Sequence, residues 1–165
     1  MLSSRKIDDL IFPAKVRALD FIHGCTLAGI DLLTTCTFRD AEAQDVLYAQ
    51  GRTRAQLDAA GLTNVEPRPG RVVTNAVAGD SFHQYRVALD VVPIIAGKPV
   101  WDTSDPVWAR VGEIGESCEL EWAARWQHNR EDAHFQFTGG LKLGDLKAGR
   151  EIPRDLWTPK SRKAA

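Results

Sequence analysis

The sequence has few cysteines, and no two of them have the spacing of a metal-binding or disulfide motif. Its three cysteines, Cys25, Cys36 and Cys118, are widely separated and odd in number. This pattern argues against a disulfide framework and against a zinc site built from thiolates. We therefore expect the fold to form in a reducing cytoplasm.

Long apolar runs are also missing. No stretch approaches the roughly 18 apolar residues of a membrane span, and the segment from Met1 to Asp9 carries charges where a signal peptide needs its apolar part. We expect no stable membrane insertion. If the protein acts outside the cytoplasm, a separate factor must release it.

The chain has no excess of charge of either sign. Its net charge is -1 and its pI is about 6.4, so the overall balance does not indicate a nucleic-acid partner. With 165 residues and 44% hydrophobic content, the chain has the size and composition of one globular domain. We assign residues 1–155 to this domain and residues 156–165 to a basic C-terminal tail.

Hydrophobic periodicity and turn residues predict alternating helices and strands. Helices are expected at 13–22, from about 40, at 53–60, from Pro106 to about 116 and at 143–147, and strands at 32–38, 72–77, 87–92 and 120–123. Gly24 is expected to stop the first helix, and Thr53 and Asp105 are expected to cap the helices that follow them. The pattern predicts a small α+β domain with a central antiparallel sheet flanked by helices.

A polar pair interrupts the apolar segment from Ser81 to Val92. His83 is followed seven residues later by Asp90, which lies within a run that has the pattern of a buried strand. An ionised carboxylate in such a strand needs a cationic partner, because burying it alone costs several kcal/mol or more. Alternation places Asp90 on the strand face opposite Leu89. These residues are candidate metal ligands.

A second polar cluster lies near His134. Alternation places His134 and Gln136 on one strand face, facing outward, and Phe135 on the face that enters the core. Two histidines and one carboxylate form a recurring ligand set of catalytic zinc. We therefore predict Zn²⁺ held by His83, Asp90 and His134, with Glu131 as the general base if a turn brings it near the site.

Several short motifs in the same order resemble the L-alanyl-D-glutamate peptidases of phage endolysins. These enzymes belong to a wider group that includes D-Ala-D-Ala peptidases, lysostaphin and sonic hedgehog. The resemblance covers most of the chain and rests on Thr37-Phe-Arg39, Gln44, Leu47-Tyr-Ala-Gln-Gly-Arg-Thr53, Ser81 with His83, Ala88 with Asp90, Glu121-Trp122 with Trp126, and Asp132-Ala-His134-Phe-Gln136.

The resemblance implies roles for further residues. It supports zinc bound by the three ligands already named and Glu131 acting first as base and then as acid. It implies that Arg39 stabilises the oxyanion at the scissile carbonyl. Ser81 is expected to hydrogen-bond within the site or to substrate, and Trp122 is expected to form a wall of the cleft.

Two positions depart from the family pattern. The family usually has glycine three residues after the first histidine, where this chain has Arg86. The turn there must either avoid positive φ or place a cation near the cleft, where Arg86 would bind substrate carboxylates. The second departure is the adjacent pair Glu131-Asp132, which offers Asp132 as an alternative base.

The resemblance implies a zinc metallopeptidase that hydrolyses the L-Ala-D-Glu bond of peptidoglycan stem peptides during host cell lysis. We expect a monomer that stays in the host cytoplasm until a factor such as a holin releases it to the cell wall. The zinc residues are also compatible with a D-Ala-D-Ala carboxypeptidase or dipeptidase. A zinc-stabilised binding module without catalysis is the alternative from another class.

Overall fold

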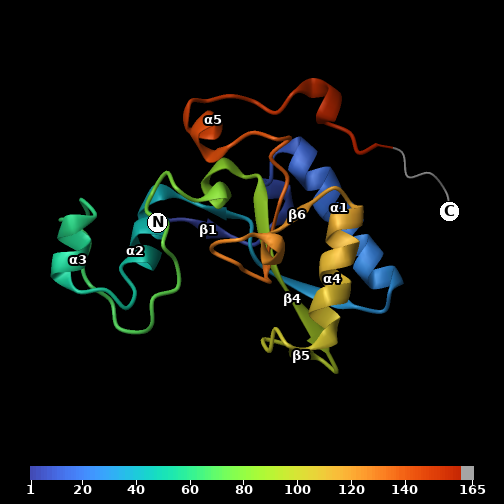
Figure 1. The fold of residues 1–165 in the computed structure, drawn as a ribbon, viewed down its shortest axis with the longest axis horizontal. Coiled ribbons are helices and arrows are strands. Elements are labelled where there is room, and N and C mark those ends of the chain that lie inside the picture. The colour runs from blue at the N-terminus through green and yellow to red at the C-terminus, as the bar shows by residue number, and fades with distance from the viewer. Residues whose placement is uncertain (161–165) are drawn as a thin grey trace.

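The structure is a computed structural model and describes residues 1–160. Helices and strands are interspersed along the chain (Figure 1). The α-helices are α1 (Phe12–Leu27), α2 (Ala41–Tyr48), α3 (Arg54–Ala59), α4 (Pro106–Ser117) and α5 (Leu143–Lys147). The strands are β1 (Ser3–Ser4), β2 (Asp31–Cys36), β3 (Phe38–Arg39), β4 (Ala88–Ile95), β5 (Lys98–Pro99), β6 (Glu121–Trp122) and β7 (His134–Gln136). Short 3-10 turns are η1 (Ile7–Asp9), η2 (Phe82–Tyr85), η3 (Ala123–Arg125) and η4 (Arg154–Leu156).

A five-stranded antiparallel sheet forms the centre of the molecule. Its strands follow the order β2-β4-β7-β6, and β5 pairs with the far end of β4. Strands β1 and β3 form a separate antiparallel pair. The predicted α+β class with a central antiparallel sheet is therefore confirmed.

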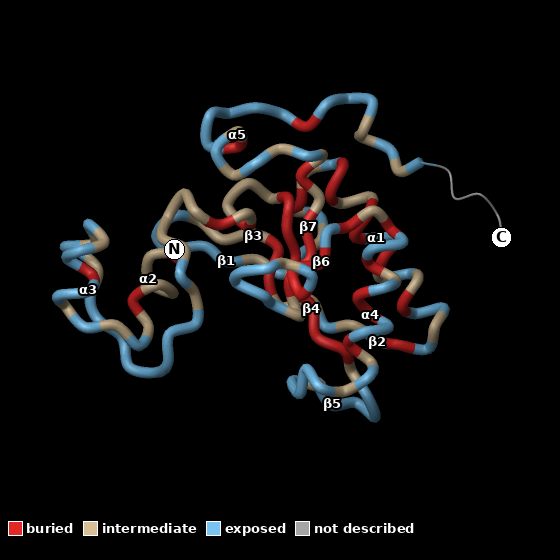
Figure 2. Tube along the Cα trace, viewed as in Figure 1, coloured by how far each residue is buried: buried red, intermediate tan, exposed pale blue. Residues whose placement is uncertain are grey.

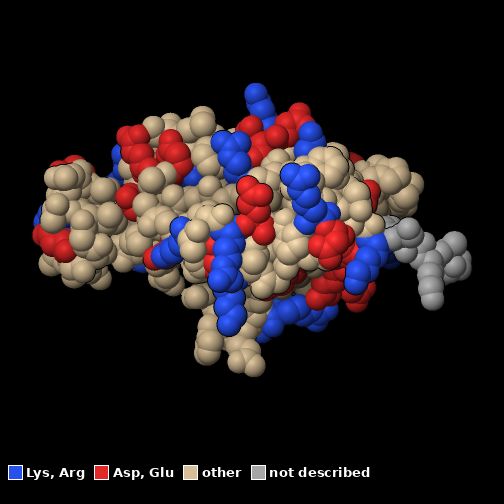
Figure 3. Space-filling view, turned by 90° about the horizontal axis from the view of Figure 1, so that it is seen from above, with Lys and Arg blue, Asp and Glu red and all other residues tan. Residues whose placement is uncertain are grey.

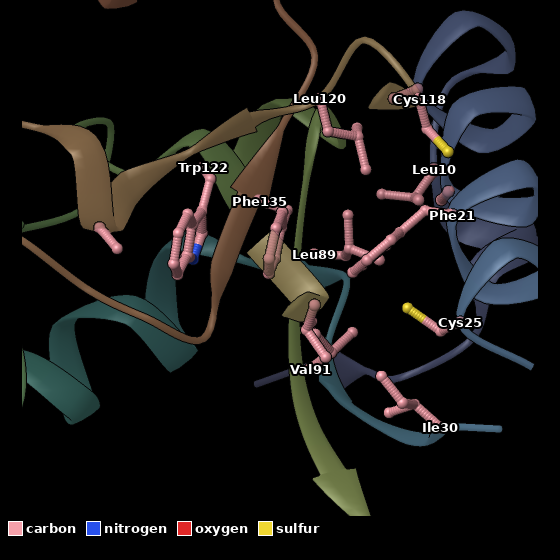
Figure 4. Packing of buried hydrophobic residues seen from close by; sticks show 14 residues of the cluster. Leu10, Phe21, Cys25, Ile30, Leu89, Val91, Cys118, Leu120, Trp122 and Phe135 are labelled. Carbon is pink, nitrogen blue, oxygen red and sulfur yellow. The ribbon is translucent and has the colours of Figure 1, made fainter. Parts of the chain in front are cut away.

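Helices α1 and α4 cover one face of this sheet (Figure 1), and the largest core lies between them and the sheet. Phe21 of α1 packs on Phe135 of β7 with ring centroids 4.6 Å apart, and Leu89 and Val91 of β4 enter the same core (Figure 4). Buried positions concentrate along β4, β7 and the inner sides of these helices (Figure 2). Residues that alternate with these core positions must lie on the other face of the sheet.

Three glycines allow α4 to pack closely against the sheet and against α1. A Cβ added to Gly112 of α4 would lie 2.2 Å from the ring of Trp122, and one added to Gly115 would lie 2.5 Å from the ring of Phe135. A Cβ on Gly24 of α1 would lie 2.9 Å from the side chain of Ile114. Gly24 is thus a packing residue inside α1. The prediction that it ends the helix is wrong, because α1 continues to Leu27.

The predicted helix caps on Thr53 and Asp105 are confirmed. The Thr53 side chain and Gln56 form a capping box at α3, and Asp105 Oδ1 accepts a hydrogen bond from the Val107 amide at 2.9 Å. Asp40 caps α2 through the Ala43 amide at 2.7 Å.

The predicted strand at 72–77 is wrong, because this segment has no strand pairing. Side chains bind its carbonyl groups instead: Arg52 Nη2 donates to the carbonyl of Thr74 at 2.8 Å, and Gln44 Nε2 donates to that of Ala76 at 2.7 Å. Its β-branched residues favour extended backbone, but no strand edge pairs with it. It runs beside the cleft described below.

The domain continues beyond residue 155. The indole of Trp157 donates to the carbonyl of Ile152 at 3.0 Å and packs near the ring of Phe12. Residues 161–165, which include the end of the predicted basic tail, lie outside the described residues.

Acidic and basic side chains are interspersed over the face shown in Figure 3. Between residues 1 and 160, no helix combines the length and the apolar character that a bilayer crossing requires.

Candidate active site

Three polar side chains lie in a row across the sheet, on the face opposite the core. Asp90 on the central strand β4 is paired with His134 of β7 on one side and with Cys36 of β2 on the other. A β-bulge between Thr34 and Cys36 shifts the register so that Cys36 comes opposite Asp90. Directly opposed residues of antiparallel strands have Cβ atoms about 4.5–5.5 Å apart. The sheet register therefore assembles the site.

Asp90 joins both predicted histidine ligands through one oxygen. Its Oδ1 lies 3.1 Å from His83 Nε2 and 3.0 Å from His134 Nδ1. His83 comes from turn η2, and both imidazoles are buried, with exposed fractions of 4% and 6%. The structure thus brings together the three residues predicted from separate motifs. His134 was expected to face outward, but it is buried at the base of the cleft.

The electrostatics of this cluster are dominated by the pairing of Asp90 with imidazole. Burial alone lowers the pKa of His83, but the charge of Asp90 and hydrogen bonds to Asp90 and Cys36 outweigh it and raise that pKa to about 10. The pKa of the Asp90 carboxyl falls far below its ordinary value despite burial, because both histidines favour its ionised form. The cluster holds a carboxylate at neutral pH.

A chain of hydrogen bonds orients His134. Its Nε2 lies 3.1 Å from Gln136 Oε1, and the Gln136 amide donates to Glu121 Oε2 at 3.0 Å. The other oxygen of Glu121 accepts from the indole of Trp126 at 2.5 Å. Partners of this kind fix the orientation of a ligating imidazole.

Arg39 is held at the edge of the site by a buried glutamine. Its Nη1 donates to Gln44 Oε1 at 2.8 Å, and its Nη2 lies 3.3 Å from Cys36 Sγ. Gln44 is fully buried, and its own amide donates to the carbonyl of Ala76. Gln44 therefore ties Arg39 to the irregular segment that borders the cleft.

A cleft of about 620 Å³ opens over these residues. It is lined by Arg39, Leu47, Val73, Thr74, Asn75, Ala76, Asp80, Ser81, Phe82, His83, Asp90, Trp126, Asn129, Arg130, Glu131, His134 and Leu143. The two predicted catalytic residues and the three predicted metal ligands all line this one cleft. Ser81 also lies there, as predicted.

Glu131 is exposed to the cleft, and its environment favours the protonated form. The surrounding protein and the negative charge of Asp90 raise the pKa of the Glu131 carboxyl, while the histidines and Arg39 partly offset the shift. Asp132 is not part of the lining, and its carbonyl accepts a hydrogen bond from Trp122. The geometry favours Glu131 over Asp132 as the base.

The donor atoms suit a metal ion such as zinc. One donor atom each from Cys36, His83 and Asp90 lie within 4.8 Å of one another. The ring nitrogens that face this cluster, His83 Nε2 and His134 Nδ1, lie 3.1 and 3.0 Å from the same Asp90 oxygen. Imidazole, carboxylate and thiolate are all ligands of zinc.

Two predicted substrate-binding residues lie elsewhere. Trp122 is a core residue that stacks on Phe135 at 6.1 Å, and Trp126 lines the cleft in its place. Trp122 of β6 is paired with Phe135 of β7. Because Phe135 faces the helices, the indole of Trp122 packs on that side of the sheet too.

Arg86 is absent from the cleft lining as well. Its Nη1 donates to the carbonyl of Asp9 at 3.2 Å and its guanidinium lies over the ring of Phe38. The turn does adopt positive φ, 58° at Arg86, so a non-glycine residue occupies the left-handed conformation. The two contacts hold its side chain away from the cleft.

Sequence comparisons connect this site with peptidoglycan peptidases. Residues 74–137, which include the three predicted ligands and Glu131, match a family model described as D-alanyl-D-alanine carboxypeptidase. The peptidoglycan L-alanyl-D-glutamate endopeptidase CwlK of Bacillus subtilis (strain 168) is 30% identical over 116 residues, which cover 66% of this chain and 61% of CwlK. The resemblance to this peptidase family is confirmed.

The chain spans about three fifths of the length of CwlK. The fold of the family is also recognisable in a solved structure. The crystal structure of the L-Ala D-Glu endopeptidase ChiX of Serratia marcescens matches with a TM-score of 0.54 at 15% identity, covering 88% of this chain and 92% of that one. At this identity the likeness establishes a shared fold.

Three further residues have contacts in the site that the sequence did not predict. Gln44 and Gln136 belong to the family motifs, and the structure shows them buried and hydrogen-bonded to Arg39 and His134. Cys36 precedes the Thr37-Phe-Arg39 motif and carried no signal of its own. Its place beside Asp90 depends on the bulge in β2.

Proposed function

We propose that the protein is a zinc-dependent peptidoglycan peptidase that hydrolyses the L-Ala-D-Glu bond of stem peptides. The observation that carries the proposal is the convergence of His83, Asp90, His134, Glu131 and Arg39 on one cleft. The similarity to CwlK supports the choice of bond, since the name of that relative specifies an L-alanyl-D-glutamate endopeptidase.

His83, Asp90 and His134 would hold the metal. Bound zinc supplies a Lewis acid that polarises the scissile carbonyl and lowers the pKa of a water molecule. Asp90 also neutralises charge at the centre of the site, and Gln136 keeps the His134 ring in position.

Glu131 moves the proton in this scheme. Its carboxylate faces the cleft and takes a proton from the attacking water, and the resulting acid returns that proton to the amine of the leaving D-Glu. A raised pKa suits both roles, because the group must bind the proton after the first step.

Arg39 stabilises the negative charge that develops on the carbonyl oxygen. A guanidinium donates hydrogen bonds in a fixed plane, and Gln44 fixes that plane from one side. Trp126 and Asn75 also line the cleft, where a peptide stem would lie.

Muropeptide analysis tests the proposal directly. Purified protein with zinc is incubated with peptidoglycan and the products are identified by mass spectrometry. We expect release of stem peptides that lack the first L-Ala, with that alanine left on the lactyl group of the glycan.

Two other outcomes would reject this bond. Release of free D-Ala or D-Ala-D-Ala would indicate a carboxypeptidase or dipeptidase, a possibility favoured by the description of the matched family model. An unchanged muropeptide profile with zinc bound would indicate a binding module without catalysis. Glu131→Gln protein serves as the control for contaminating hydrolases.

We further propose that the enzyme acts as a monomer in host cell lysis during phage development and remains in the host cytoplasm until a holin-like factor releases it. Lysis of cells that express the chain, with and without a coexpressed holin, tests this role. Lysis that is equally fast without the holin would contradict it.

A further inference from the structure

The cysteine in the polar row differs in its surroundings from the other two cysteines. Cys25 and Cys118 belong to the apolar core between the helices and the sheet. Burial, together with the nearby Cys118, raises the pKa of the Cys25 thiol to about 12. Cys36 is equally buried, with 4% exposed, but it lies on the opposite face of the sheet beside Asp90 and His83.

The contacts of Cys36 favour an anionic sulfur. Arg39 Nη2 lies 3.3 Å from Sγ, and the sulfur shares a 4.8 Å neighbourhood with donor atoms of His83 and Asp90. Cationic neighbours are the usual setting of cysteines that bind metals or react.

A second observation is the position of Cys36 in the sheet. Cys36 of β2 and His134 of β7 lie opposite Asp90 on its two sides. Asp90 Oδ1 lies 3.1 Å from His83 Nε2, and donor atoms of Cys36, His83 and Asp90 lie within 4.8 Å of one another. A metal held by Asp90 and His83 would therefore have this sulfur beside it.

We propose that Cys36 is a fourth protein ligand of the metal, alongside His83, Asp90 and His134. The inference rests on the metal site of the proposed function. On binding, the thiol loses its proton to solvent and the thiolate forms a bond to the divalent ion, with no change of oxidation state. The thiolate and the Asp90 carboxylate together balance the charge of the ion.

This fourth donor has a chemical consequence. Four protein ligands are typical of structural zinc, whereas catalytic zinc usually has three and keeps a position open. A thiolate also donates more charge to the ion than imidazole does. With four protein ligands, a water molecule would have to enter as a fifth ligand. The metal would then be held more tightly, and would activate that water less, than in a site with two histidines and one carboxylate.

X-ray absorption at the zinc edge of the full chain loaded with zinc measures the sulfur directly. We expect one sulfur per zinc at about 2.3 Å in addition to nitrogen and oxygen neighbours at about 2.0–2.2 Å. The wild-type spectrum needs no variant, so it decides the question even if a substitution at Cys36 impairs folding. A shell of nitrogen and oxygen alone would overturn the proposal.

Variants assign the sulfur to a residue. Cys36→Ser should remove the sulfur shell and weaken zinc binding by about tenfold or more, the lower end of what lost partners of a metal site cost. Cys25→Ser and Cys118→Ser are matched controls and should keep the shell. A sulfur shell that persists in Cys36→Ser protein would contradict the assignment.

Cobalt gives an independent readout. Protein loaded with Co²⁺ should show a near-ultraviolet absorption from thiolate-to-metal charge transfer, lost in Cys36→Ser and kept in Cys25→Ser. The muropeptide assay separates this proposal from the proposed function. A wild-type enzyme without zinc–sulfur bonds that still cleaves stems would reject only the role of Cys36, whereas a zinc–sulfur bond without cleavage would reject only the hydrolysis.

Discussion

The two faces of the central sheet use the same strands for opposite purposes. On one face, Leu89 and Phe135 pack against α1 and α4 in an apolar core. On the other, Asp90 and His134 are partly or fully buried and depend on each other for hydrogen bonds. Apolar burial stabilises the fold, whereas burying polar groups is costly unless every partner is present. The first face therefore stabilises the fold, and the second carries the residues of the proposed chemistry.

The largest expected effect is on the site face. His134→Ala should abolish metal binding at stoichiometric zinc, and with it activity, because one of the predicted ligands is lost. Elemental analysis of purified protein and the increase in Tm on adding zinc measure the loss. His23→Ala, at an exposed histidine of α1, is the control and should behave as the wild type. Full zinc occupancy in His134→Ala protein would contradict the site.

Glu131→Gln should separate catalysis from metal binding. We expect kcat to fall by about 10²–10⁴-fold, the usual contribution of a general acid-base group, with zinc content and Tm unchanged. Asp132→Asn is the matched control and should have a far smaller effect, because Asp132 does not line the cleft. The reverse ranking in a steady-state assay would assign the base to Asp132.

Phe135→Ala changes the neighbour of His134 on the core face. We expect a loss of about 3–5 kcal/mol in the free energy of unfolding, as for other buried phenylalanines. Urea denaturation measures it. Because the side chain points away from the site, the folded variant should still bind one zinc at low temperature. A metal-free but stable Phe135→Ala protein would refute the division between the faces.

Arg39→Lys should have a smaller effect. We expect kcat to decrease by roughly 10–100-fold with little change in KM. The reason is that an ammonium cannot reproduce the planar hydrogen bonds of a guanidinium at an oxyanion. Comparison of kcat and KM on a stem peptide tests this. A change in KM alone would make Arg39 a residue that binds the ground state. Arg86→Lys, away from the cleft, serves as the control.

The smallest effect concerns pH. The raised pKa of His83, about 10, means that its imidazole is protonated in the metal-free protein at neutral pH. Zinc must displace this proton, so the apparent affinity should increase by roughly tenfold per pH unit for each proton released. Calorimetry in buffers of different ionisation enthalpy counts the protons. An affinity that is constant between pH 6 and 8 would contradict the pairing with Asp90.

The stability of the metal-free protein should depend on the same group with a defined sign. A pKa raised from 6.5 to about 10 stabilises the fold fully below the unfolded value, and this contribution is lost as the pH rises through the folded value. Thermal melts of metal-free protein between pH 6 and 10 should therefore show a falling contribution from His83.

The strand alternation predicted much of this division. Asp90 and His134 were placed opposite Leu89 and Phe135 from period-two patterning alone, and the register confirms these faces. The face on which a side chain lies depends on the period-two alternation of its own strand. This alternation is local and can therefore be read from the sequence.

Features that depend on register between distant segments were not predictable. Cys36 reaches Asp90 only because a bulge shifts β2, and the spacing argument against a thiolate site considered cysteines in pairs. The resemblance placed Trp122 in the cleft, but the face that this residue of a two-residue strand presents is set by its partner Phe135. Arg86 was expected near the cleft because it replaces the family's glycine, and nothing local in the sequence reveals its contacts with Asp9 and Phe38.

Because α4 packs so closely on the sheet, substitutions in this helix should affect turnover even though the helix lies away from the cleft. Any side chain at Gly115 would meet the ring of Phe135, whose neighbour in β7 is His134. A substitution there would push the strand and shift an imidazole on the far side of it. Screens for more active variants should therefore find inactivating changes at Gly112 and Gly115, on a helix that never touches substrate. An engineering library is best kept away from these two positions and directed at the exposed rim of the cleft.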